Sequence, residues 1–204
     1  MHKPEWIIFD VGGVMLNWRR SSADLAKKLD VDRDVLLKTL FEFAPMMNLG
    51  KTSPRVGWEK ILERLGSRED PDKIIKLWRE KKYWYNGTLK LVRDLHMSGY
   101  KLAIFTNSWL GLTKKGNKQD LPPEIKLFKF IFDSSVEGLQ KPDARFYELV
   151  EKKTNSSGSN ILFIDDDESN LNSARERNWQ VFLISSKGGF HLDDTEDLRR
   201  RLKL

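Results

Sequence analysis

Asp10 stands where an apolar run stops, a position from which a carboxylate can do chemistry. The run 6–9 is short and unbroken, as in a buried strand of a parallel sheet, and open α/β sheets bind ligands beyond the carboxyl ends of their strands. Gly12 and Gly13 follow closely and allow the backbone to turn sharply beside a bound group. A carboxylate held there can attack phosphorus and form an aspartyl-phosphate. A strand that ends in an Asx turn is the alternative, and this stretch alone favours the turn.

Polar residues also follow two later apolar runs. Thr106 and Asn107 come directly after one of them, where a hydroxyl and an amide could donate hydrogen bonds to phosphate oxygens. Asp165 and Asp166 come directly after another and begin a run of acidic residues, which repel one another unless protons or a cation neutralise them. Oxygen ligands of this kind indicate Mg²⁺. The alternatives are an ordinary turn at the first pair and stabilisation of a helix N-terminus at the second.

Lys141 precedes Pro142 in a turn that is expected to lead into a helix. A lysine at this position could neutralise a phosphate and a nucleophile together as a point charge, although an exposed lysine is the ordinary alternative. Asp143 is placed to cap the helix, so its predicted role is structural.

The elements that must position these groups alternate between strands and helices, which predicts a parallel α/β sheet. The segment 17–85 contains no convincing strand and several stretches with helical spacing, so it is expected to be a helical insertion between the first strand and the rest of the sheet. The predicted core domain is therefore 1–16 together with 86–204. The predicted strands are 6–9, 101–105, 128–132, 161–164 and 181–184, and a terminal helix is expected over 195–204.

Composition narrows the classes of protein. The chain of 204 residues has no cysteine, which excludes disulfides and thiolate chemistry, and its 3 histidines are scattered, which argues against a histidine zinc site or a Ser-His-Asp triad. No apolar run approaches the roughly 18 residues of a membrane helix, and no signal peptide is apparent, so we expect a cytoplasmic protein. The net charge of +6 favours anionic partners, but the basic residues are dispersed and no nucleic-acid-binding motif is present. Monomer and homodimer both remain open.

Taken in order, the four groups resemble the motifs of the haloacid dehalogenase (HAD) superfamily. The stretch 9–14, Thr106-Asn107, Lys141-Pro142-Asp143 and Asp165-Asp166 match its first to fourth motifs, and the match covers essentially the whole chain. The resemblance implies a Rossmann-like parallel sheet with helices on both faces, and the insertion 17–85 resembles a helical cap of the C1 type. The segments 138–147 and 163–174 are most similar to a branch of small phosphatases that act on sugar phosphates.

The resemblance also implies a role for each group. Asp10 would be the nucleophile and a Mg²⁺ ligand. The backbone carbonyl of Gly12 would be a second Mg²⁺ ligand and would lie next to the phosphoryl group. Thr106, Asn107 and Lys141 would hold that phosphoryl group. Lys141 would also neutralise charge in the transition state. The metal ligands would be completed by Asp166 directly and by Asp165 through water.

One position departs from the superfamily pattern. Most HAD phosphatases carry an aspartate two residues after the nucleophile, where it acts as general acid and base, but this chain has Gly12. Losing a general acid typically costs about 10²- to 10⁴-fold in rate. The sequence predicts a Mg²⁺-dependent phosphatase of a small phosphorylated metabolite, for example a sugar phosphate. The alternatives are a 2-haloacid dehalogenase, a branch that resembles this chain in lacking that aspartate but needs no metal, and a catalytically weak binding protein.

Overall fold

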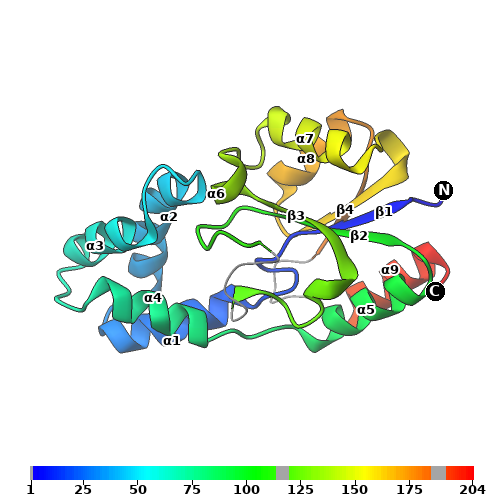
Figure 1. Ribbon diagram of the computed structural model, residues 1–204. Helices are drawn as coiled ribbons and strands as arrows, with labels where there is room; N and C mark the ends of the chain where they lie inside the picture. The colour runs from blue at the N-terminus through cyan, green and yellow to red at the C-terminus, as the bar shows by residue number, and fades with distance from the viewer. Residues whose placement is uncertain (1, 114–119, 185–191) are drawn as a thin grey trace.

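A computed structural model describes residues 2–113, 120–184 and 192–204. Within them, five parallel strands form one sheet in the order β3-β2-β1-β4-β5 (Figure 1). The strands are β1 (Trp6–Phe9), β2 (Lys101–Thr106), β3 (Phe128–Asp133), β4 (Ile161–Asp165) and β5 (Gln180–Leu183). The parallel α/β sheet expected from the sequence is confirmed. From β1 the chain adds β2 and β3 on one side of the sheet and then β4 and β5 on the other. Sheets of this kind bind ligands at the carboxyl ends of the strands where the order reverses, here beside β1.

Helices cover both faces of the sheet. Successive residues of β1 point to opposite faces, so the strand can pack against helices on each side. Ile7 and Phe9 belong to the core that includes residues of α5 and α9, whereas Trp6 and Ile8 belong to the core that includes residues of α7 and α8. All four side chains are buried, so each face of the strand contributes to a hydrophobic layer. The covering helices are α5 (Asn86–Met97), α9 (Leu192–Leu202), α7 (Ala144–Thr154) and α8 (Glu168–Glu176).

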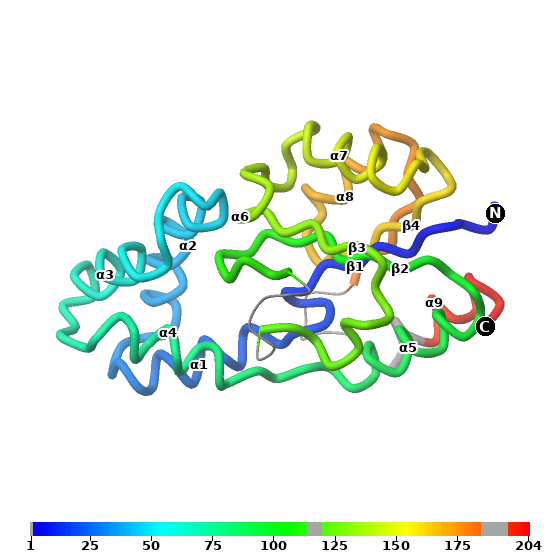
Figure 2. Tube along the Cα trace, in the orientation of Figure 1, coloured from blue at the N-terminus to red at the C-terminus, as the bar shows by residue number. Residues whose placement is uncertain are grey.

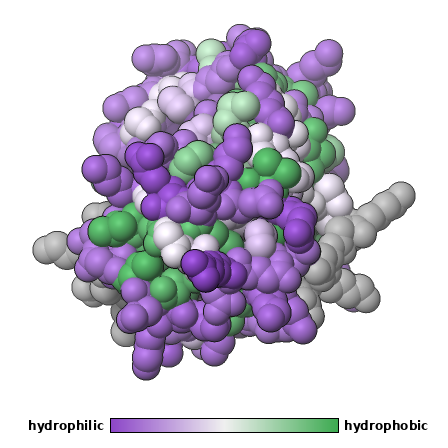
Figure 3. Space-filling view, turned by 90° about the vertical axis from the view of Figure 1, so that its left-hand side faces the viewer, coloured by the Kyte–Doolittle hydropathy of each residue, from purple (hydrophilic) through white to green (hydrophobic). Residues whose placement is uncertain are grey.

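Four helices follow β1 and precede α5 in the chain. They form a separate group that lies to the left of the sheet in Figures 1 and 2. They are α1 (Trp18–Leu29), α2 (Arg33–Asn48), α3 (Pro54–Arg64) and α4 (Pro71–Glu80), and we call them the helical insertion. Polar N-caps begin each one, and Pro54 and Pro71 occupy the first turns of α3 and α4. Its core contains Trp58 and Trp78. The outward face is mostly hydrophilic with scattered hydrophobic residues (Figure 3).

Several boundaries differ from the sequence prediction. Strand β5 begins one residue earlier than expected, and α9 spans Leu192–Leu202 instead of 195–204. A four-residue helix, α6 (Ser134–Glu137), follows β3 where none was predicted, because Asp133 caps it and Gly138 ends it in the left-handed conformation. Among the described residues, no helix has the length and apolar character needed to cross a membrane.

Candidate active site

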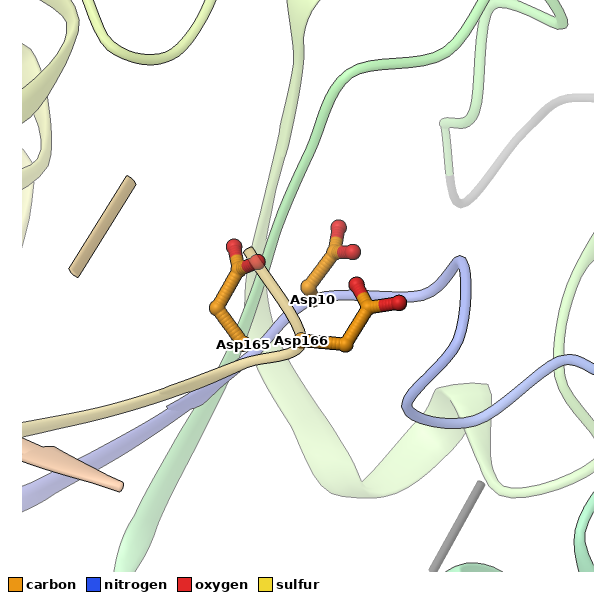
Figure 4. A group of neighbouring side chains, drawn as sticks. All are labelled: Asp10, Asp165 and Asp166. Atoms are coloured by element: carbon orange, nitrogen blue, oxygen red, sulfur yellow. The ribbon is translucent and has the colours of Figure 1, made fainter. Parts of the chain in front are cut away.

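The carboxyl ends of β1 and β4 bring three aspartates together. The main-chain N–H of Asp10 donates to the carbonyl of Ile164 at 2.9 Å, so the two strand ends are joined directly before the acidic residues. Asp10, Asp165 and Asp166 each present a carboxylate oxygen within 4.8 Å of the others (Figure 4). Residues that are more than 150 positions apart in the chain therefore form one acidic cluster.

Lys141 lies against this cluster with its side chain 1% exposed. Its Nζ is 2.6 Å from Oδ2 of Asp165 and 3.0 Å from Oδ1 of Asp10. Burial alone lowers the pKa of Lys141, but the two adjacent carboxylates outweigh burial and raise it above its usual value. The ammonium group is therefore held in its charged form between the two aspartates.

Asn107 positions Lys141. Its Oδ1 accepts from the main-chain N–H of Lys141 at 2.8 Å, and its Nδ2 donates to the carbonyl of Lys141 at 2.9 Å. This reciprocal pair fixes the loop 138–143 beside the end of β2. The sequence predicts that Asn107 binds a phosphoryl group, but in this arrangement one amide N–H and the amide oxygen are engaged by the main chain. Thr106, the last residue of β2, is buried and lines the same cavity as Asp10 and Lys141.

Asp165 is fully buried and is held by several donors. Besides Lys141, it accepts from the main-chain N–H of Asp167 at 2.8 Å and from Nδ2 of Asn170 at 3.1 Å. These bonds fasten Asp165 to the beginning of α8. Sequence reasoning missed Asn170, although its position on the first turns of a helix that begins at the acidic run is a signal that could have identified it.

The negative charge of the acidic cluster is only partly compensated within the protein. Burial raises the pKa of Asp10 to about 7, with Lys141 opposing the shift and the neighbouring aspartates adding to it. Burial also raises the pKa of Asp166 to about 6, and Asp165 contributes. Three carboxylates face one ammonium group, so the donors and their charge fit a divalent cation that prefers oxygen ligands.

The two glycines after Asp10 differ in how much space surrounds them. Gly13 has φ of +76°, and a Cβ there would lie 2.0 Å from Oδ2 of Asp166, so only glycine fits. A Cβ on Gly12 would instead lie 3.5 Å from Cδ1 of Trp18 and 3.9 Å from Oδ2 of Asp10, which are ordinary contacts. A Cβ at position 12 therefore meets no clash, in contrast to one at position 13.

A cavity of about 530 Å³ opens from the acidic cluster toward the helical insertion. Large apolar side chains line much of it, including Trp18 of α1, Phe41 of α2, Trp78 of α4 and Trp109 from the loop after β2. Two charged residues that the sequence did not single out, Lys82 and Asp120, also lie in its wall. Neither stands in a motif, so no local signal identified them.

Known proteins share this fold and parts of this sequence. The chain is 28% identical to sesquiterpene phosphatase astK of Aspergillus oryzae over 200 residues, which covers 92% of this chain and 89% of that protein. It is 30% identical to enolase-phosphatase E1 of Methylococcus capsulatus over 112 residues, which covers 52% of this chain and 46% of that protein.

Solved structures with low sequence identity agree in fold. The HAD family enzyme bt-2542 of Bacteroides thetaiotaomicron, in complex with magnesium and inorganic phosphate, has a TM-score of 0.70 and 18% identity, covering 90% of this chain and 96% of its own. The L-2-haloacid dehalogenase RSc1362 has a TM-score of 0.71 and 17% identity over the full length of both chains. The sequence family of haloacid dehalogenase-like hydrolases matches residues 4–178, and this chain is a hydrolase that belongs to that family.

Proposed function

We propose that this protein is a Mg²⁺-dependent phosphatase of a small phosphorylated metabolite, acting through an aspartyl-phosphate. The observation that carries the proposal is the cluster of Asp10, Lys141, Asp165 and Asp166 at the switch point of the sheet. Two relatives named as phosphatases and a structural neighbour crystallised with magnesium and phosphate support it.

In the proposed reaction, a carboxylate oxygen of Asp10 attacks phosphorus and the bond from phosphorus to the alcohol oxygen breaks. Water then hydrolyses the aspartyl-phosphate and releases inorganic phosphate. Lys141 opposes the rise in the pKa of Asp10 that burial causes, and it would offset the negative charge that gathers on the phosphoryl oxygens. Thr106 would donate its hydroxyl to one of these oxygens.

The metal would be held by the carboxylates of Asp10 and Asp166 and the main-chain carbonyl of Gly12. Asp165 would assist through water because its own oxygens already accept from Lys141, Asp167 and Asn170. When bound, Mg²⁺ would neutralise the acidic cluster and polarise the phosphoryl group.

Gly12 limits the class of substrate. With no acid at position 12 to protonate the departing oxygen, we expect the enzyme to favour esters whose leaving group needs little protonation, such as sugar 1-phosphates.

Phosphate release tests this function. The wild-type protein is incubated with p-nitrophenyl phosphate and a panel of sugar phosphates, once with Mg²⁺ and once with EDTA. Release that requires Mg²⁺ is the expected result. No release from any ester, together with halide release from 2-chloropropionate, would replace the proposal by the dehalogenase alternative. If the protein releases neither phosphate nor halide, that result would favour the binding-protein alternative.

A further inference from the structure

A second charged group lies in the wall of the cavity, away from the acidic cluster. Lys82 comes from the segment that follows α4, and Asp120 comes from the loop between β2 and β3. Their side chains are 6% and 3% exposed, and both line the cavity that contains Asp10. The proposed mechanism uses neither of them.

The charges in this group are close but poorly hydrogen-bonded. Nζ of Lys82 is 3.8 Å from Oδ1 of Asp120, which is too far for a hydrogen bond. Nε of Arg79 lies 3.2 Å from Oδ2 of Asp120 without the alignment of one. Among the described residues, neither the ammonium of Lys82 nor either carboxylate oxygen of Asp120 has a hydrogen-bond partner. Buried polar groups are nearly always paired, so this group has unused binding capacity.

The titration of both residues agrees with this picture. Burial lowers the pKa of Lys82 to about 8, and the attraction of Asp120 only partly opposes it. Burial also raises the pKa of Asp120 above its usual value, with Lys82 and Arg79 opposing. A ligand group that bonds to both side chains would relieve a burial cost that the surrounding charges offset only in part.

The main chain places this group at a useful distance from the reacting atoms. Leu16 pairs with Gly12 on one side and with Trp84 on the other, and Asn17 donates to the carbonyl of Tyr83 at 2.8 Å. Leu16 therefore lies between Gly12 and the segment that carries Lys82. This arrangement suits contact with a part of the leaving alcohol that is several bonds away from phosphorus.

We propose that Lys82 and Asp120 form a subsite for a hydroxyl group on the alcohol portion of the substrate. The inference rests on the proposed phosphatase function. A hydroxyl oxygen accepts from the ammonium while its hydrogen is donated to the carboxylate, so one group satisfies both side chains. An anionic group could bond to Lys82 but not to the carboxylate of Asp120, and an apolar group could bond to neither side chain. The substrate class is thus a hydroxylated phosphate monoester, such as a sugar or polyol phosphate.

Binding to an inactivated protein tests the subsite separately from catalysis. In an Asp10→Asn background with Mg²⁺, calorimetry compares α-D-glucose 1-phosphate with cyclohexyl phosphate, which has a six-membered ring but no hydroxyl groups. Adding Lys82→Met should weaken binding of the sugar phosphate by about 10-fold or more and change binding of the cyclohexyl ester less than about 2-fold. Lys82→Gln, which keeps a donor, should give an intermediate loss. Lys81→Met, at the exposed neighbouring lysine, is the matched control.

The alternative is that this group only ties α4 to the loop before β3. In that case Lys82→Met would weaken both esters equally or neither, and that result would overturn the subsite. If Lys82→Met does not fold, Asp120→Asn and Lys82→Gln give the same comparison. Phosphate release from p-nitrophenyl phosphate by the wild-type protein separates the two proposals. Failure there removes the phosphatase function, whereas loss of the binding difference removes only the subsite.

Discussion

The two polar regions of the cavity differ in how their charges are satisfied. At the sheet edge, Lys141 contacts two carboxylates at 2.6 and 3.0 Å, and Asp165 is held by three donor groups. In the wall near α4, Lys82 and Asp120 are also buried but stand 3.8 Å apart, and neither side chain has a hydrogen-bond partner among the described residues. The groups proposed to react are thus held in place by hydrogen bonds and ion pairs within the protein itself. The groups proposed to recognise the substrate keep their hydrogen-bonding capacity for a ligand.

The largest expected effect comes from removing the nucleophile at the sheet edge. Asp10→Asn should lower phosphate release from p-nitrophenyl phosphate by at least about 10³-fold, since the amide cannot form the acyl-phosphate. Lys141 would still pair with Asp165, so the fold should persist. Glu176→Gln, at an exposed position on α8, is the control. Activity within tenfold of the wild type would show that this edge is not where the reaction starts.

The next effect concerns the metal. Asp166→Asn removes one of the proposed ligands and should lower Mg²⁺-dependent release by about 10²- to 10³-fold, as should EDTA acting on the wild type. Phosphate release measured over a Mg²⁺ titration checks both, and a higher Mg²⁺ requirement in the variant is expected. Full activity of the variant without added metal would contradict the metal-dependent mechanism.

Gly12→Asp is expected to have a smaller effect, and to raise the rate of phosphate release. A Cβ at position 12 meets no clash, and a carboxyl group there could protonate an alcohol leaving group. Release from glycerol 3-phosphate should rise about 10- to 100-fold, whereas release from p-nitrophenyl phosphate, whose leaving group departs as an anion, should change little. Gly12→Asn, which has a similar size but no acid, should show no gain. Equal effects of both variants on both esters would refute the argument.

The smallest expected effect is on stability without metal. Asp166→Asn in EDTA should raise the free energy of unfolding by about 1–2 kcal/mol at pH 7.5, because it removes a half-buried negative charge that lies beside Asp165. The pKa of Asp166 is about 6 in the folded protein and lies above its usual 3.8, so the folded state retains a proton that the unfolded state has lost between these values. The wild type therefore loses stability relative to the variant as pH rises through this window.

Urea unfolding in EDTA at pH 4.5, 5.5 and 7.5 measures this difference. The gain from Asp166→Asn should be small at the lowest pH and complete at the highest. Added Mg²⁺ should then stabilise the wild type more than the variant at pH 7.5. A variant that is less stable than the wild type in EDTA at pH 7.5 would show that Asp166 is compensated within the protein.

Much of the sheet edge could be predicted from the sequence. Short apolar runs identify buried parallel strands, and the carboxyl ends of parallel strands meet at one edge, so Asp10, Thr106 and Asp165 had to lie near one another. The helical spacing of 17–85 likewise predicted the helices that form the insertion. Its role as a cap and its boundaries at 17 and 85 stay predictions.

Local apolar patterns were sufficient to identify the residues at the strand ends, because strand formation depends on neighbouring residues. What those residues contact depends on how distant segments pack together. The pairing of Asn107 with the main chain of Lys141 and the approach of Lys82 to Asp120 each join segments more than thirty positions apart. No local pattern encodes such contacts, because their energies depend on distances and burial that exist only when the helices and loops pack around the sheet.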